Sequence, residues 1–256
     1  MNKIIKISFI LSLMATILIG CNNSTSDKRE LTISAAASLN ETLNEITGEF
    51  LKDNPNINIV CNYGSSGSLQ KQIEQGAPCD LFLSASEKNV SELIDENLIV
   101  NDTNKTFVKN SLVLVAPKDS TITSINDLKT NKVNHIAIGE ISSVPAGMYA
   151  NEALENLNLK ESLNNKLVYA KDVKEVLAWV ASGNADVGFI YKSDAVSSKE
   201  VKIISEIPDN SHTPINYVAG VIKNSTNEDI AKEFEDYLFS NKAKTIFEKY
   251  GYIVQW

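Results

Sequence analysis

The stretch LTISAAASLNETLNEITGEF, residues 31–50, joins a short apolar segment to an amphipathic one. Residues 31–36 are mostly apolar and end in small side chains, which indicates a buried strand. After Ser38, apolar side chains recur every three or four residues, as on one face of an α-helix, at Leu39, Leu43, Ile46 and Phe50. Because Ser is a favoured residue at a helix start, this stretch predicts a strand that runs directly into a helix.

The same strand and helix order recurs along the chain. A first series predicts strands at 57–62 and 81–84, and helices from Leu69 and over 87–97. A second series predicts strands at 135–139, 167–169 and 187–191, and helices at 146–157 and 173–182. Two further helices are predicted at 228–239 and 242–250. This order predicts an α/β fold with parallel sheets and right-handed crossovers.

Two longer apolar strands, at 107–117 and 216–222, flank the second series. They predict two lobes that are joined by two crossings. On this basis lobe 1 comprises residues 31–111 and 218–256, and lobe 2 comprises residues 112–217.

The N-terminus, MNKIIKISFILSLMATILIGC, has a short positive region followed by an apolar run that is too short for a comfortable transmembrane helix. Its Leu18-Ile19-Gly20-Cys21 ending resembles the lipobox of bacterial lipoproteins. The resemblance implies that residues 1–20 are a removed signal peptide and that Cys21 carries a lipid. Residues 21–30 then form a polar tether that anchors the protein to the outer face of the cell membrane. An ordinary signal peptide with a chance cysteine is the alternative.

Charge excludes some classes of partner. The full chain has a net charge of −8, which becomes −10 when a leader containing Lys3 and Lys6 is removed. This balance argues against nucleic-acid binding. The single arginine, Arg29, falls in the predicted tether, so an arginine fork does not hold whatever anion this protein binds.

Cysteines and histidines are few. Cys61 and Cys79 lie in or beside predicted strands, where they could pair in an exported protein or remain buried thiols, and the sequence leaves this open. His135 and His212 are the only histidines, and no cluster with metal-ligand spacing occurs.

A serine hydrolase is one alternative function. Residues 64–68, GSSGS, approach the G-x-S-x-G pattern, and Ser68 and Lys71 match S-x-x-K. However, neither histidine sits in a recognisable motif, and the S-D-N and K-T-G partner elements are absent. Such short matches arise often by chance, and Lys71 is more simply explained as a solvated helix residue.

A more specific pattern lies where strands run into helices. These junctions carry hydroxyl or small residues: Ser38, Ser65 and Ser66, Pro145-Ala146-Gly147, and Asp172-Val173. In open α/β sheets, ligands bind beyond the carboxyl ends of the strands. Free amides and the positive helix end favour anions there, and small side chains let the backbone approach closely. Each serine taken alone could equally be an ordinary helix cap.

Together, five ordered motifs resemble the molybdate-binding protein of ABC importers. They are AAASL at 35–39, SSGSL at 65–69, QIEQGAPCDLFLSA at 72–85, VPAGMYA at 144–150 and GFIYKSDA at 188–195. The resemblance covers residues 31–256. It implies a two-lobed periplasmic-binding-protein fold of type II, with the ligand clamped between the lobes. It also implies a monomeric binding protein, not an enzyme, that needs no cofactor and delivers its ligand to an ABC permease and its ATPase.

The resemblance also assigns binding roles residue by residue. It implies hydroxyl and backbone donors at Ser38 and Ser66 in lobe 1, with Ser65 open as an alternative to Ser66. In lobe 2 it implies backbone N–H donors at Ala146 and Val173 and a phenol donor at Tyr191.

These donors suit the implied ligand. Molybdate and tungstate are dianions that carry no proton at neutral pH, so they need hydrogen-bond donors only. Bonds to a charged partner contribute about 1.5–3 kcal/mol each, so several neutral donors could hold a desolvated dianion. Tyr191 could instead be a packing residue at the lobe edge. The sequence leaves open the choice between molybdate and tungstate, with sulfate or another oxyanion as the alternative ligand.

Overall fold

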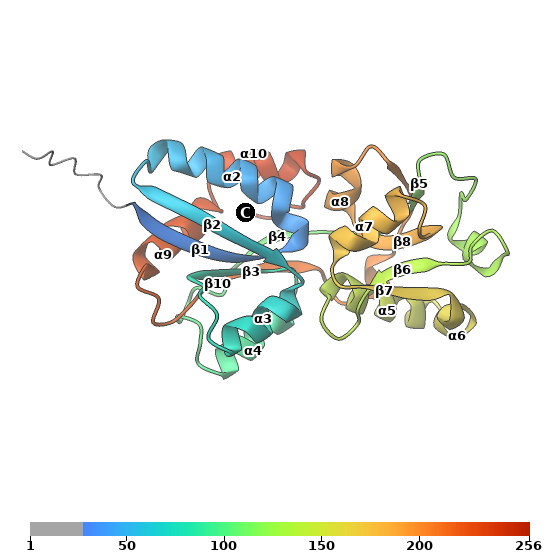
Figure 1. Ribbon diagram of the computed structural model, residues 1–256, viewed down its shortest axis with the longest axis horizontal. Helices are drawn as coiled ribbons and strands as arrows, with labels where there is room; N and C mark the ends of the chain where they lie inside the picture. Colours follow the sequence, from blue (N-terminus) through green and yellow to red (C-terminus); the bar gives the residue numbers. More distant parts are fainter. Residues whose placement is uncertain (1–27) are drawn as a thin grey trace, which may run out of the picture.

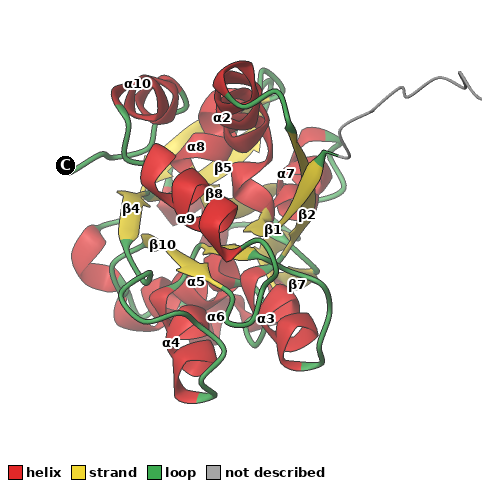
Figure 2. Cartoon of the chain, turned by 90° about the vertical axis from the view of Figure 1, so that its left-hand side faces the viewer, coloured by secondary structure: helices red, strands yellow, loops and turns green. Residues whose placement is uncertain are grey.

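The computed structural model describes residues 28–256 as two lobes side by side (Figure 1). Each lobe is built on one five-stranded sheet, with strand orders β2-β1-β3-β10-β4 and β7-β6-β8-β5-β9. Helices cover the faces of both sheets, as seen from a second direction in Figure 2. The predicted α/β class and the two lobes are therefore present.

Lobe 1 begins with the opening strand–helix stretch. Its strands are β1 (Arg29–Ala36), β2 (Ile57–Gly64), β3 (Leu81–Ser84), β4 (Thr106–Lys109) and β10 (Asn216–Val221). Its helices are α2 (Asn40–Asp53), α3 (Ser66–Glu74), α4 (Glu87–Asp95), α9 (Glu228–Tyr237) and α10 (Asn241–Lys249). A 3-10 turn, η1 (Ala37–Leu39), lies between β1 and α2. On one face of the sheet, Phe50 of α2 packs edge-on against Phe234 of α9, with 5.0 Å between ring centroids.

Lobe 2 has a matching plan. Its strands are β5 (Leu112–Pro117), β6 (Ile136–Gly139), β7 (Leu167–Ala170), β8 (Val187–Tyr191) and β9 (Val201–Glu206). Its helices are α5 (Pro145–Asn156), α6 (Lys160–Leu163), α7 (Val173–Ala181) and α8 (Lys192–Ser197). Short 3-10 turns occur at η2 (Ile125–Lys129), η3 (Asn164–Lys166) and η4 (Asp209–Ser211). The apolar face of α7 is buried through Val173, Val176 and Val180.

The sheets are mixed: most strands are parallel, as the βα order predicts, and one strand in each sheet runs antiparallel to its neighbours. β10 runs antiparallel to β3 and β4, and β5 runs antiparallel to β8 and β9. β5 and β10 each follow a crossing from the other lobe. Each therefore runs in the direction opposite to the strands of the βα units in its own sheet. The remaining strands share one direction, so their carboxyl ends meet at the same edge of each sheet.

The two crossings also differ from their predicted form. The predicted strand 107–117 divides into β4 in lobe 1 and β5 in lobe 2, and the chain changes lobes at Asn110 and Ser111. The second crossing is the segment 207–215 between β9 and β10, rather than the strand that follows it. The two crossings lie side by side, because Asn110 N donates to Ile215 O over 3.1 Å. β10 begins at Asn216, two residues before the predicted lobe boundary.

The start of the folded body corrects the predicted tether. Arg29 and Glu30 belong to β1, and the Arg29 guanidinium forms a two-pronged ion pair with Asp229, each N···O distance being 2.7 Å. Signal-peptide residues 1–20 and Cys21 lie outside the described residues. Within residues 28–256, no helix is long and apolar enough to cross a membrane.

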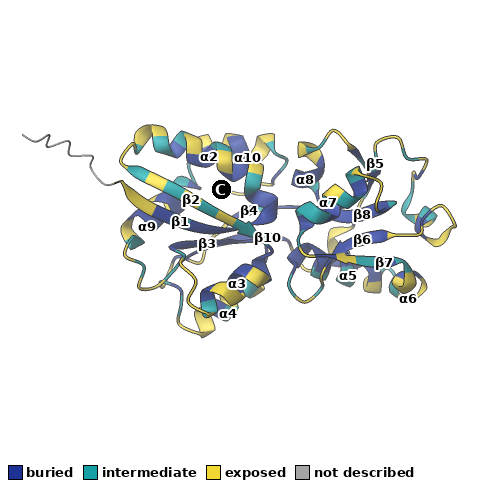
Figure 3. Ribbon diagram, viewed as in Figure 1, coloured by how far each residue is buried: buried dark blue, intermediate teal, exposed yellow. Residues whose placement is uncertain are grey.

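Burial follows the layers. The central strands are deeply buried, whereas the edge strands β2 and β9, the outer helix faces and the loops carry exposed residues (Figure 3). All four residues of β3 and of β6, and all five of β8, are buried. A strand that is buried on both faces reads as a continuous apolar run, which is why these segments were visible in the sequence.

Candidate functional site

A cavity lies between the two lobes, and it is lined from both sides by the ends of strands and the starts of helices. The free space in it is small, about 210 Å³ including its opening to solvent. Its walls come from the carboxyl ends of β1, β2 and β3 in lobe 1 and of β6, β7 and β8 in lobe 2. They are Ala36, Ala37, Ser38, Gly64, Ser65, Ser66, Ala85, Val144, Pro145, Ala146, Asp172, Val173 and Tyr191.

All five residues predicted to bind the ligand line this one cavity. Ser38 and Ser66 come from lobe 1, while Ala146, Val173 and Tyr191 come from lobe 2. The sequence motifs are up to 153 positions apart, between Ser38 and Tyr191. The fold unites them because strands of one direction present their carboxyl ends at the same sheet edge, and the two edges face each other.

Backbone amides reach the cavity at three helix starts. Ser66 and Val173 are the first residues of α3 and α7, and Ala146 is the second residue of α5 after Pro145. The first amides of a helix have no acceptor within the helix, and the helix dipole is positive at that end. Gly147 lets α5 start close to β6, since a Cβ there would lie only 2.0 Å from Gly139 O. The arrangement therefore presents N–H groups and positive partial charge to an anion.

The serine side chains are not ordinary helix caps. Ser38 lies inside the 3-10 turn, and its Oγ lies 2.7 Å from the hydroxyl of Tyr217. Ser66 Oγ accepts a 3.0 Å hydrogen bond from Ala85 N, which leaves its own proton for another acceptor. Ser65 precedes α3, but its hydroxyl bonds to Ser68 Oγ at 2.8 Å. These contacts favour Ser66 over Ser65 as a donor into the cavity.

Tyr191 presents a buried hydroxyl that has no partner. Its side chain is 1% exposed, and its oxygen has no hydrogen-bond partner among the described residues. Burial raises the pKa of Tyr191 well above its usual value, so the phenol keeps its proton. A buried hydroxyl without a hydrogen-bond partner destabilises the folded protein by about 1–3 kcal/mol. The Tyr191 hydroxyl is therefore suited to donate to an acceptor on a bound ligand.

Charged side chains are kept to the margin of the cavity. Among its lining residues only Asp172 is ionisable besides Tyr191, and Asp172 Oδ1 accepts from Glu175 N as the cap of α7. Lys174 follows Val173 and lies 2.8 Å from the buried Asp194 of its own lobe. Burial raises the pKa of Asp194 to about 6, although Lys174 opposes the shift. The donors that face the cavity are therefore neutral.

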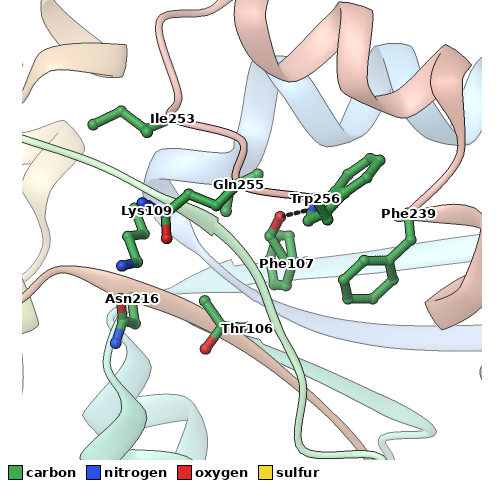
Figure 4. A pocket seen from close by; sticks show the side chains of 9 residues that line it. Thr106, Phe107, Lys109, Asn216, Phe239, Ile253, Gln255 and Trp256 are labelled. Carbon is green, nitrogen blue, oxygen red and sulfur yellow. Dashed lines mark hydrogen bonds between the residues drawn. The ribbon is translucent and has the colours of Figure 1, made fainter.

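Two other features of residues 28–256 relate to ligand binding. The groove in Figure 4, with about 710 Å³ of free space, lies on the outside of lobe 1 between β4 and the C-terminal tail. Lys109 is the only charged side chain in its lining, and Trp256 Nε1 donates to Phe107 O across it at 2.7 Å. In residues 28–256 no group of three or more His, Cys, Asp or Glu side chains is arranged to hold a metal ion.

The contacts of the serine and cysteine motifs bear on two points that the sequence left open. No histidine lines the cavity beside Ser65 and Ser66, and Lys71 pairs with Glu74 at 2.9 Å on the exposed side of α3. Neither arrangement provides the base that a serine nucleophile needs. Cys61 and Cys79 are both free thiols rather than a disulfide.

Two residues at the site carried no role in the sequence analysis. Ala85 supplies the amide that holds Ser66, and Tyr217 holds Ser38. Ala85 could have been found, because it directly follows the predicted strand at 81–84 within one of the recognised motifs. Tyr217 lies in β10, far from any motif, and its pairing with Ser38 depends on how β10 enters lobe 1.

The fold and the cavity define a class: two-lobed proteins that enclose a small ligand at the carboxyl ends of strands from both lobes. The chain belongs to the family of bacterial extracellular solute-binding proteins, whose family model matches residues 31–253. This result confirms the predicted type II binding-protein fold. The family is one of solute binding rather than of catalysis.

Similar proteins span almost the whole chain. YvgL of Bacillus subtilis, whose name describes an ABC transporter substrate-binding lipoprotein, is 45% identical over 255 residues, 96% of this chain and 97% of its own. The molybdate-binding protein ModA of Haemophilus influenzae is 36% identical, covering 98% of this chain and 99% of its own. The solved periplasmic molybdate-binding protein of Azotobacter vinelandii superposes with a TM-score of 0.81 at 28% identity, over 88% of this chain and 100% of its own.

Proposed function

We propose that this protein captures molybdate or tungstate between its lobes and delivers it to the permease of an ABC importer. The observation that carries the proposal is the unpartnered, fully buried hydroxyl of Tyr191 in a cavity lined by free amides and serine hydroxyls. A site that presents mainly neutral hydrogen-bond donors, with Asp172 Oδ1 engaged by Glu175 N, favours an anion that has no proton to donate. The names of the relatives from Haemophilus and Azotobacter support molybdate as the ligand.

The roles of the five residues follow from their contacts. Ser38 and Ser66 donate through their hydroxyls, Ala146 and Val173 through their amides, and Tyr191 through its phenol. Each bond to a charged ligand contributes about 1.5–3 kcal/mol, so five such bonds offset much of the cost of desolvating a dianion. The positive ends of α3, α5 and α7 add to this without a formal countercharge.

Titration calorimetry on the soluble body, residues 28–256, tests the ligand directly. Molybdate and tungstate should bind at least about tenfold more tightly than sulfate, since a smaller ion leaves longer bonds and 1.4 kcal/mol is tenfold in affinity. Sulfate binding as tight as molybdate would instead support the sulfate alternative. Failure of all three anions to bind would overturn the proposal, and labelling by a serine-reactive phosphonate would then favour a hydrolase.

The cavity serines have a control in Ser68, which lies in α3 with Ser66. Ser38→Ala and Ser66→Ala should each weaken molybdate binding by about 1–3 kcal/mol. Ser68→Ala should leave affinity unchanged, because the Ser68 hydroxyl bonds to Ser65 and does not line the cavity. Unchanged affinity in both cavity variants would mean that these serines serve the fold alone.

We also propose that a lipid on Cys21 anchors the protein outside the cell membrane, which keeps the loaded lobes near the permease. The lipobox-like ending at Cys21 and the lipoprotein name of the Bacillus relative support this. Cells that express the full chain and its Cys21→Ser variant should be fractionated. The anchor idea fails if both forms partition equally between membrane and soluble fractions.

A further inference from the structure

Ser38, the proposed hydroxyl donor of lobe 1, is held by a second hydroxyl from a distant strand. Ser38 Oγ and the Tyr217 hydroxyl lie 2.7 Å apart, and either atom could be the donor from distance alone. Tyr217 belongs to β10 and is 0% exposed, while Ser38 is 3% exposed. The direction of this hydrogen bond therefore decides whether the Ser38 proton faces Tyr217 or the cavity.

Asn110, in the first crossing between the lobes, fixes that direction. Ser111 N donates to Asn110 Oδ1 over 2.9 Å, and because a backbone amide can only donate, the accepting atom must be the oxygen. The Asn110 amino group then faces Ser193 Oγ at 2.8 Å and the Tyr217 hydroxyl at 3.4 Å. Since an amino group only donates, the Tyr217 oxygen accepts from it.

The proton of Tyr217 has one acceptor among the described residues. The Tyr217 hydroxyl has two neighbours within hydrogen-bond distance, the Asn110 amino group and Ser38 Oγ, and only Ser38 can accept. If Ser38 donated instead, the Tyr217 proton would be buried without a partner, which is costly. Burial raises the pKa of Tyr217 well above its usual value, so this proton is present at physiological pH.

We infer that Tyr217 is a positioning residue for ligand binding: it donates to Ser38 and so turns the Ser38 proton into the cavity. Asn110, Tyr217 and Ser38 form a chain of donors that all point the same way, from the crossing between the lobes toward the ligand. Hydrogen bonds in such a chain polarise one another, so each strengthens the next. The inference rests on the proposed function, because Ser38 has a ligand to donate to only if an anion enters the cavity.

A double-mutant cycle tests this on residues 28–256, with molybdate as the probe. Tyr217→Phe keeps the ring and its edge-on packing against Tyr191 and Tyr252, with centroids 5.8 and 5.4 Å away. We expect it to weaken molybdate binding by about three- to tenfold, the loss of one hydrogen bond. Adding Tyr217→Phe to Ser38→Ala should weaken binding no further, because Tyr217 acts only through Ser38.

Stability without ligand supplies an independent readout. Ser38→Ala leaves the Tyr217 proton buried with no acceptor, so the double variant should melt at a higher temperature than Ser38→Ala alone. Tyr237→Phe is the control, since the Tyr237 hydroxyl is also buried in lobe 1 but does not line the cavity, and its removal should leave affinity unchanged.

The two ideas fail in different ways. No molybdate binding by the unmodified protein overturns the proposed function. Binding that is normal in the unmodified protein and unchanged by Tyr217→Phe overturns the positioning role. Losses in affinity that add fully in the double variant also overturn it, since Tyr217 would then act independently of Ser38.

Discussion

Lys174 of α7 and Glu41 of α2 form an ion pair across the cleft, with 2.6 Å between Nζ and Oε2. Glu41 follows the Ser38 turn in lobe 1, and Lys174 follows Val173 in lobe 2, so the pair closes one side of the cavity. On the other side Gly67 N donates to Ser143 O over 3.0 Å, and Tyr149 donates to Ala85 O over 3.3 Å. These contacts exist only while the lobes are together.

Breaking the ion pair should speed ligand release. Glu41→Gln leaves the Lys174–Asp194 pair in place and removes only the attraction between lobes. Because the pair is partly exposed, it contributes about 0.2–1 kcal/mol, so molybdate should dissociate about 1.4- to 5-fold faster in stopped flow. The difference should vanish at high salt. Glu45→Gln, which breaks the Lys249 pair within lobe 1, is the control. Slower release from Glu41→Gln would mean that Glu41 acts mainly by repelling the anion.

Gly67 allows the backbones of the two lobes to approach closely at Ser143. A Cβ at this position would lie 2.6 Å from Ser143 O and 2.9 Å from Ser143 Cα. Gly67→Ala should therefore oppose closure and weaken molybdate binding by at least about tenfold, equivalent to 1.4 kcal/mol. The unfolding free energy without ligand should stay within about 0.5 kcal/mol, because the three atoms nearest to that Cβ all belong to Ser143 of the other lobe.

A second glycine in lobe 1 provides the comparison. Gly48 lies on the exposed side of α2, and a Cβ there would meet nothing within 4 Å. Gly48→Ala should raise stability by about 0.5–1 kcal/mol through helix propensity and leave affinity unchanged. Equal affinities of the Gly67 and Gly48 variants, measured by calorimetry, would remove Gly67 from the closing mechanism.

A buried carboxyl in lobe 1 should make stability depend on pH. Glu235 of α9 is 1% exposed, and Lys105 Nζ is 3.6 Å from its Oε2. Burial raises its pKa from 4.5 to about 7, against the effect of Lys105. The folded state thus holds a proton that the unfolded state releases, so this group's contribution to stability falls as pH rises from about 4.5 through 7.

Glu235→Gln isolates that contribution, because the amide has no charge to bury. Relative to the unmodified protein, the variant should gain on the order of 1–3 kcal/mol of unfolding free energy at pH 8 and little at pH 5. Urea unfolding at both pH values measures the difference. A gain that is equal at pH 5 and pH 8 would show that Glu235 does not titrate in this range.

The local pattern of apolar and polar residues predicted most of the fold, because most strands are continuous apolar segments and most helices are amphipathic. The strands at 81–84 and 187–191 were predicted with the bounds that the structure has. β9 was missed because Val201, Ile203 and Ile204 form neither a strict alternation nor a continuous apolar run, as befits an edge strand in which Ile203 is 39% exposed. The break at Asn110 was also missed, since the flanking strands are both apolar and only the fold shows that they join different sheets.

The candidate site likewise has parts that local sequence patterns predict and parts that they do not. Ser38, Ser66 and Tyr191 stand at strand ends that the pattern locates, so their convergence follows from the rule for parallel strands. The Tyr217–Ser38 hydrogen bond and the Glu41–Lys174 pair depend instead on how distant elements pack. No spacing in the sequence encodes either contact.

The hydroxyl of Tyr191 should matter only when ligand is bound. Tyr191→Phe keeps the ring, whose centroid lies 5.8 Å from that of Tyr217. It deletes a hydroxyl that has no hydrogen-bond partner among the described residues. Without ligand, the variant should be as stable as the unmodified protein or slightly more stable, because an unmet buried hydroxyl is lost. With molybdate, the rise in melting temperature should shrink, since ligand stabilisation follows RT ln(1 + [L]/Kd).

Kinetics identify where the Tyr191 hydroxyl acts. Tyr191 lies in lobe 2, so its bond to an anion held by Ser38 and Ser66 of lobe 1 forms when the lobes close. Its loss should therefore appear mainly as faster dissociation in stopped flow, by about ten- to hundredfold for a bond to a charged ligand, with little change in association. Tyr237→Phe deletes an unpartnered hydroxyl outside the cavity, on a half-buried side chain, and should change neither rate. If Tyr191→Phe dissociates no faster than the Tyr237 control, the phenol is not a ligand donor and Tyr191 serves the packing of the lobe edge.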